Sequence, residues 1–217
     1  MNGHAFSNYT TAITGEITLT AKIRADDYIP EVNETILSQY ESLGNGNFIW
    51  RFLTTGKLTL YSVSGGVGNT VAQSSVTLSS VGCVDGLTDV WVRMHHVPDN
   101  GAGNSVTKFY YSFDITNNED SVNWTQLGST QTSAAIANRD SSTYAHKVGV
   151  YVTIVGDFFG RIYQASARAG DPTSPVVYNP RFSKWETDDT SRIDDKGVTW
   201  TLQNDATIQN KYGDLLD

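Results

Sequence analysis

The sequence predicts an all-β protein whose antiparallel strands form a sandwich or a barrel. The main observation is an alternation of apolar and polar side chains, clearest in residues 15–25, 90–97 and 148–155. Because successive side chains of a strand point to opposite faces, each such run places one face on a core. Gly, Asn, Asp and Pro separate the runs, and no long stretch follows the helical period. Any function is therefore expected on a sheet face or at loop tips.

In the first half of the chain, the alternation predicts strands at residues 15–25, 34–40, 48–53, 57–63 and 71–78. The third and fourth strands form a hairpin that turns over Thr54, Thr55 and Gly56. A loop rich in Gly and Ser precedes the fifth strand, and a turn follows it at residues 83–89.

The second half is expected to hold strands at residues 90–97, 106–113, 124–127, 148–155 and 160–168, then two or three short strands that end near Ile208. The strands at 90–97 and 106–113 form a hairpin over Gly, Pro, Asp and Asn residues. The strands at 148–155 and 160–168 form a second hairpin. Only residues 138–145 and the terminal Leu215-Leu216 could hide a helical turn. No segment resembles a flexible linker, so we expect one domain over residues 1–217, with its core at about 13–208.

Composition and charge exclude several classes of function. Fifteen basic and twenty-three acidic residues give a net charge of −8, and no cluster of Lys and Arg is present. Nucleic-acid binding depends on such clusters, and anionic membranes are disfavoured for the same reason. No run approaches the roughly 20 apolar residues of a membrane span, and no secretory signal is recognised at the amino terminus.

Cysteine and histidine offer little for catalysis or metal binding. Cys83 is the only cysteine, so an intrachain disulfide and a zinc site built on several cysteines are both excluded, and we interpret Cys83 as a small buried residue. His95 and His96 are adjacent on a predicted strand and point to opposite faces, so they do not chelate one ion together.

Three groups of segments along the chain resemble a known family. The segments are residues 13–28, 34–38 and 54–58; then Trp91-Val-Arg, 99–103, 109–112 and Asn123-Trp-Thr-Gln-Leu-Gly; and finally Gly160-Arg-Ile-Tyr, 194–202 and 205–208. In this order they look like the laminin-G-like and concanavalin A-like domains of minor tail proteins of tailed bacteriophages. The resemblance implies a two-sheet antiparallel jelly-roll sandwich, and often a role in recognising a cell surface.

We therefore expect a non-enzymatic virion protein of a phage tail or particle exterior, made in the bacterial host, which binds host-surface carbohydrate. Other virion proteins are the expected partners. A homo-oligomer is also expected, because tail appendages are symmetric and sheet edges need protection. One alternative is an architectural or decoration subunit without a ligand. The other is a glycan hydrolase or lyase.

The hydrolase alternative lacks its catalytic spacing. Jelly-roll glucanases, which this fold resembles, carry Glu-x-Asp-x-x-Glu on one strand, so that two carboxyl groups face the same side about 5 Å apart. Glu31 and Glu34 occur without the middle aspartate, and Glu119-Asp120 lies at a predicted loop tip. Ser112-x-Asp114, followed by Trp124, is similar to a sialidase turn motif with the wrong spacing, and we interpret it as a structural turn.

The best candidate for a binding surface is the face of the 90–113 hairpin that points away from the core. Aromatic rings beside hydrogen-bonding side chains suit sugars, which present apolar ring faces and hydroxyl groups. The candidate ligand-binding residues are Trp91, Arg93, His95, Lys108, Tyr110 and Tyr151. The alternative is that a loop covers Trp91 and Tyr110, which would make them structural.

No cofactor is predicted apart from a possible calcium ion. Laminin-G-like domains often hold one Ca²⁺ at a loop rim through carboxylates and backbone carbonyls, so the resemblance makes the loop carboxylates candidates. These are Asp26-Asp27, Asp99-Asn100, Glu119-Asp120 and Asp188-Asp189. Each is also the kind of residue that stabilises an ordinary turn.

Overall fold

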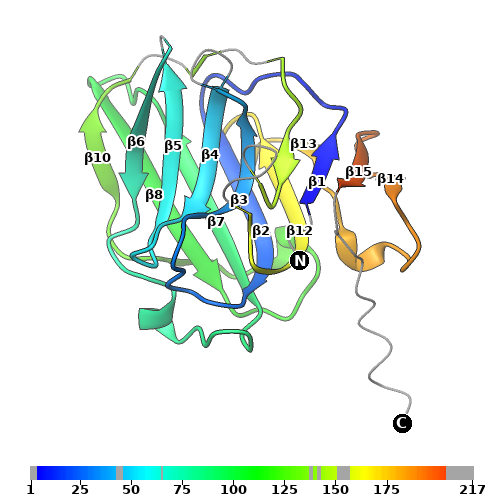
Figure 1. Ribbon diagram of the computed structural model, residues 1–217. Helices are drawn as coiled ribbons and strands as arrows, with labels where there is room; N and C mark the ends of the chain where they lie inside the picture. The colour runs from blue at the N-terminus through cyan, green and yellow to red at the C-terminus, as the bar shows by residue number, and fades with distance from the viewer. Residues whose placement is uncertain are drawn as a thin grey trace.

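The protein is a sandwich of two antiparallel sheets, as the sequence predicted. The computed structural model describes residues 4–42, 46–64, 66–136, 139–140, 143–150 and 157–203. In Figure 1, β3 to β6 form the near layer, and β2, β7, β8 and β12 lie behind them. This arrangement has the two layers of a jelly roll.

The first sheet has eight strands in the order β14-β15-β1-β11-β3-β4-β5-β6. Their bounds are β1 His4–Ser7, β3 Glu34–Tyr40, β4 Gly46–Phe52, β5 Leu58–Ser64, β6 Val67–Gln73, β11 Lys147–Val148, β14 Ser191–Ile193 and β15 Thr199–Gln203. The second sheet has the order β10-β8-β7-β2-β12-β13, and β9 also pairs with β8. Its strands are β2 Ile17–Ala25, β7 Val90–Val97, β8 Asn104–Ser112, β9 Thr125–Gln126, β10 Gln131–Ala134, β12 Gly160–Arg168 and β13 Val176–Tyr178.

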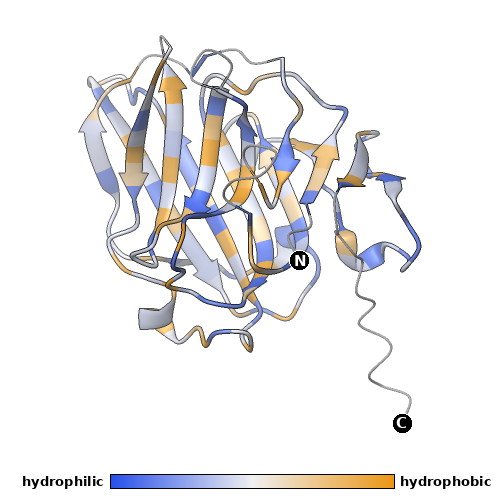
Figure 2. Ribbon diagram, in the orientation of Figure 1, coloured by the Kyte–Doolittle hydropathy of each residue, from blue (hydrophilic) through white to orange (hydrophobic). Residues whose placement is uncertain are grey.

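The core lies between the sheets and is made by the alternating apolar residues. Leu19 and Ile23 of β2 are fully buried in it, beside Val92 and Met94 of β7. Figure 2 shows the resulting alternation of apolar and polar bands along the strands. The second sheet therefore turns the odd-numbered side chains of β7 and the even-numbered side chains of β2 away from the core.

Several boundaries differ from the prediction. Of the expected hairpin of residues 148–155 and 160–168, residues 151–155 lie outside the described residues; in the described part, β11 pairs with β1 and β3 in the first sheet, whereas β12 pairs with β2 and β13 in the second. Strand β6 begins at Val67, inside the stretch expected to be a loop, and β1 and β10 had no expected counterpart. Strand β1 depends on β11 and β15, which are distant in sequence, whereas β6 forms a hairpin with the preceding β5 through polar residues that the local pattern assigned to a loop.

The described residues contain no α-helix, only 3-10 turns at Ser79–Val81, Glu119–Ser121 and Phe182–Lys184. Residues 139–140 and 143–145 are not helical, whereas 138, 141–142 and Leu215-Leu216 lie outside the described residues. Within the described ranges, no helix is long and apolar enough to cross a membrane.

Candidate functional site

The predicted surface residues that the structure describes share the face of the second sheet that points away from the core, here called the outer face. In the strand register, Trp91 and Arg93 of β7 lie opposite Lys22 and Thr20 of β2. On the other side of β7, Arg93 lies opposite Tyr110, and His95 opposite Lys108. The prediction that these side chains share one face is confirmed.

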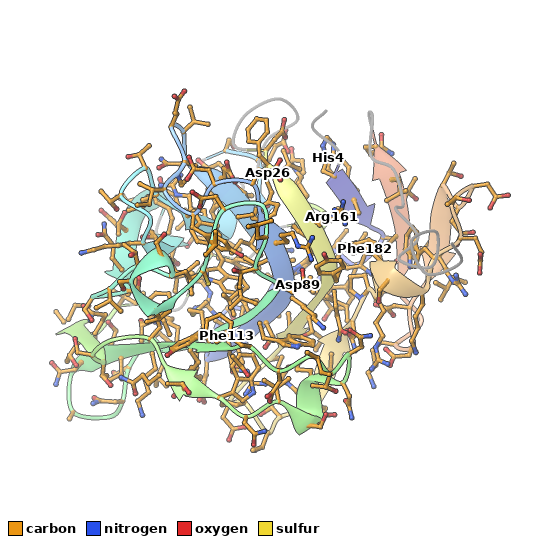
Figure 3. All side chains as sticks on the ribbon, turned by 90° about the horizontal axis from the view of Figure 1, so that it is seen from below. His4, Asp26, Asp89, Phe113, Arg161 and Phe182 are labelled. Carbon is orange, nitrogen blue, oxygen red and sulfur yellow. The ribbon has the colours of Figure 1, made fainter. Side chains whose placement is uncertain are left out.

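The prediction that this face is open at Trp91 and Arg93 is wrong. Trp91 has no exposed surface, and Arg93 is 8% exposed. Residues 113–123, here called the strap, leave the end of β8 and cross the outer face; Figure 3 labels Phe113, where the strap begins. The indole Nε1–H of Trp91 donates to the carbonyl of Thr116 at 3.0 Å. The alternative in which a loop covers Trp91 is therefore the observed one.

Lys22 attaches the first part of the strap to the sheet. Its Nζ donates to the carbonyls of Ile115 at 3.0 Å and Thr116 at 3.1 Å, and to Oδ1 of Asn117 at 2.9 Å. The ammonium group also lies 5.7 Å from the centre of the Trp91 ring. A buried ammonium surrounded by oxygens and an aromatic ring is well compensated, so this contact is a structural anchor.

Glu119 fills the centre of the outer face. Its Oε1 accepts from Nη2 of Arg93 at 3.3 Å and from Nη2 of Arg168 at 3.1 Å, and its Oε2 accepts from the Ser166 hydroxyl. Burial lowers the pKa of Arg93, while Glu119 raises it in part. Asp120 adds a second ion pair to Arg168 at 2.9 Å. These carboxylates complete a charge network with Arg93 and Arg168.

Asp114 closes the base of the strap. Its backbone N–H donates to Oγ of Ser112, and its Oδ2 accepts from the backbone N–H of Asn123 at 2.6 Å and from the Asn123 side chain at 3.1 Å. The carboxylate thus joins the two ends of the strap. The interpretation of Ser112-x-Asp114 as a structural turn is confirmed.

Beside the strap, the outer face keeps an accessible aromatic surface, here called the Trp124 platform and made of Trp124 and Tyr110. Both rings are partly buried and retain contact with solvent. The Arg93 guanidinium lies 4.0 Å from the centre of the Trp124 ring and supports it from the sheet side. Tyr110 is opposite both Arg93 and Gln126 in the sheet, and burial raises its pKa.

Sequence reasoning placed Trp124 on a short strand and did not consider it as a binding residue. Trp91 and Trp124 lie edge to face with ring centres 6.3 Å apart, so the two indoles occupy the same region at different depths. Trp91 is the inner ring and Trp124 the outer one. The only signal for this in the sequence is that Trp124 directly follows the polar strap.

The other predicted binding residues are His95, Lys108 and Tyr151. His95 Nε2 lies 2.7 Å from Oε1 of Glu16, which orients the imidazole along the sheet. His96 points to the opposite face, as expected, where its Nδ1 contacts Oγ1 of Thr107 at 2.8 Å. Lys108 is partly exposed. Tyr151 lies outside the described residues.

The loop carboxylates proposed for calcium are occupied mainly by turn hydrogen bonds. Asp27 accepts from the backbone of Ile29, Asp99 from that of Gly101, and Asp189 from that of Glu186. Within the described part of the chain, no three His, Cys, Asp or Glu side chains gather in a way that could hold a metal ion. Among the described residues, the calcium expectation therefore has no specific site.

Two buried acidic groups have strongly shifted pKa values. Burial raises the pKa of the Cys83 thiol to about 12, so this cysteine is protonated and inert, as expected. Burial, with the Asp27 and Asp26 carboxylates adding to it, raises the pKa of Glu34 to about 7, although a hydrogen bond from Phe159 N–H at 3.1 Å opposes the shift. Glu34 is a strand residue that links the two sheets through Phe159, whose carbonyl accepts from Asp26 N–H.

No known protein-family model matches the chain, and no curated protein resembles it at a significant level.

Proposed function

We propose that this protein is a non-enzymatic carbohydrate-binding domain that acts through the Trp124 platform. The observation that supports this most is the stacking of Arg93 under Trp124 at 4.0 Å. The guanidinium is held by Glu119 and Thr20, so it fixes the plane of the indole before any ligand arrives. A rigid aromatic ring with partial exposure loses little conformational freedom on binding.

The surroundings of the platform suit a sugar. Pyranose rings present apolar faces to aromatic side chains and hydroxyl groups to polar ones. Tyr110 offers a phenol next to the indole, and Lys108 is one position away along the same face of β8. Gln126 is exposed on the adjacent strand β9. Stacking by Trp124, with hydrogen bonds from these three side chains, would orient one or two sugar rings.

The resemblance of the sequence to phage tail domains supports the exterior of a virion as the location, and host-surface glycan as the ligand. The negative net charge of the chain supports solubility and repels nucleic acid. The other virion proteins remain the proposed partners.

An architectural subunit is the second candidate, and two observations favour it. The strap seals the centre of the outer face, and β6 is a seven-residue edge strand without Lys, Arg or Pro. An unprotected edge of that length can pair with another chain. The expected homo-oligomer would use such an edge.

The test is an array of purified bacterial cell-wall polysaccharides, followed by titration of any glycan that binds. We expect Trp124→Ala to weaken binding by about 2 kcal/mol, roughly thirtyfold, which is typical of a central aromatic contact. An array without binding would favour the architectural role. Release of reducing ends from the glycans would establish a hydrolase instead.

Trp91→Ala serves as the control for this substitution. Trp91 is fully buried under the strap, so its truncation should cost about 3–5 kcal/mol of unfolding free energy. Trp124→Ala should cost much less, because the Trp124 ring is already partly exposed. Urea denaturation of both variants shows whether a loss of binding comes from the missing aromatic ring or from a loss of fold stability.

A further inference from the structure

Two arginines lie directly opposite each other at one end of the outer face. Arg24 of β2 and Arg161 of β12 are register partners. Like charges in this position repel each other and destabilise a sheet. The chain has only fifteen basic residues and a net charge of −8, so this placement is not a consequence of abundant positive charge.

The neighbouring side chains hold Arg24 in a fixed orientation. Its Nε donates to Oδ1 of Asp89 at 2.8 Å, and the Tyr163 hydroxyl donates to the same oxygen at 2.9 Å. Tyr163 reaches this oxygen because the register of β12 shifts between Ile162 and Gln164, a bulge that adds one residue. Bulges of this kind redirect side chains and recur next to binding sites. Asp89 and Arg161 are both labelled in Figure 3.

Arg161 and Lys108 differ from the other cations of the outer face, which the strap or Asp89 holds in place. Arg93 and Arg168 are paired with Glu119, Lys22 with strap oxygens, and Arg24 with Asp89. Arg161 is exposed, and in the described ranges it forms no ion pair with an acidic side chain. The Nη groups of Arg24 have no hydrogen-bond partner among the described residues, whereas Arg161 contacts the Tyr163 hydroxyl.

We propose that Arg161 and Arg24, with Tyr163, form a subsite for an anionic group of the glycan, either a carboxylate or a phosphate. Two guanidinium groups present several N–H donors in a planar arrangement that matches either anion. The anion would neutralise Arg161 and relieve the repulsion across the strands. Tyr163 would place an aromatic ring beside the anionic sugar.

This inference rests on the proposed function, because it names the chemical class of the glycan. The subsite is nevertheless separate from the Trp124 platform. The row that contains Lys22 and Trp91, which the strap covers, lies between the row of Arg24 and that of Arg93. The two sites can therefore be altered independently.

The experiment is an NMR titration of the ¹⁵N-labelled protein with trigalacturonate, an oligomer of glycerol phosphate and neutral galactotriose. We expect both anionic probes, but not galactotriose, to shift the amide signals of Arg161, Tyr163 and Asp89. Arg161→Gln should weaken binding of the preferred anion by roughly tenfold or more, as expected for a lost charge-assisted hydrogen bond. Lys196→Gln, which removes an exposed charge from the turn between β14 and β15, is the matched control.

The comparison of the two anionic probes assigns the source of the charge, a uronate or a phosphate polymer. Equal binding by the Arg161→Gln and Lys196→Gln variants, or equal shifts with galactotriose, would overturn the subsite. If array glycans lose affinity on Trp124→Ala but not on Arg161→Gln, the subsite fails and the proposed function stands. If the anionic probes shift Arg161 while no polysaccharide binds, the subsite stands and the proposed function fails.

Discussion

At the scale of single residues, the sheet face on which a side chain lies and the exposure of that side chain are determined by different interactions. The alternation along β7 correctly placed Val92 in the core and Trp91 on the opposite face. It could not show that Trp91 is covered, because the covering atoms belong to Thr116, 25 positions away. The accessible indole is that of Trp124, whose position depends on Arg93.

Glu34 gives a prediction for the pH dependence of stability. Its pKa rises from 4.5 to about 7 on folding, mainly through burial. The stabilisation from keeping it protonated is complete below pH 4.5 and is lost as the pH rises through 7. Glu34→Gln, which mimics the protonated form, should therefore gain about 3 kcal/mol relative to the parent protein between pH 4.5 and pH 8.

Urea denaturation at several pH values measures this difference. Burial lowers the pKa of His96 to about 3 and that of His146 to about 4, so their contributions are present above pH 6.5 and are lost as the pH falls. The parent protein and the Glu34→Gln variant share these histidines, so the histidine contributions cancel in the difference between the two. A difference between the variants that does not change with pH would contradict the assignment to Glu34.

At the scale of elements, the strap determines what the second sheet can offer to a ligand. Sequence reasoning recognised residues 115–123 as a loop and Asp114 as a turn residue. It did not connect this loop to Lys22 or Arg168, since both contacts join positions far apart in the chain. Most of the central strands were predictable because their pattern is local. The path of the strap was not predictable, because ion pairs between residues far apart in the chain hold it in place.

Removal of the Glu119 charge tests the role of the strap. Glu119→Gln leaves Arg93 and Arg168 buried without their shared carboxylate, which should cost about 3–5 kcal/mol of unfolding free energy. Asp120→Asn alters the adjacent residue, whose side chain is 75% exposed, and should change stability by no more than about 0.5 kcal/mol. Urea denaturation and hydrogen exchange of the strap amides measure both effects. Similar costs for the two variants would show that the buried network does not hold the strap.

At the scale of the whole molecule, the protein is a two-sheet sandwich whose second sheet gathers cationic side chains in an acidic chain. Among the described residues, six Lys and Arg side chains lie on its outer face: Lys22, Arg24, Arg93, Lys108, Arg161 and Arg168. The strap neutralises the centre of this face with Glu119 and Asp120. The Trp124 platform and Arg161 remain accessible on either side of it.

The central claim is that ligand contact occurs at Trp124 and not at Trp91. The indole N–H signals in an ¹⁵N–¹H correlation spectrum, assigned with single Trp→Phe variants, report on both rings in the intact protein. On addition of a polysaccharide selected from the array, the Trp124 signal should shift in a saturable way. The Trp91 signal should stay in place, because its N–H remains bonded to Thr116 beneath the strap. A saturable shift of Trp91 with an unchanged Trp124 signal would contradict the account.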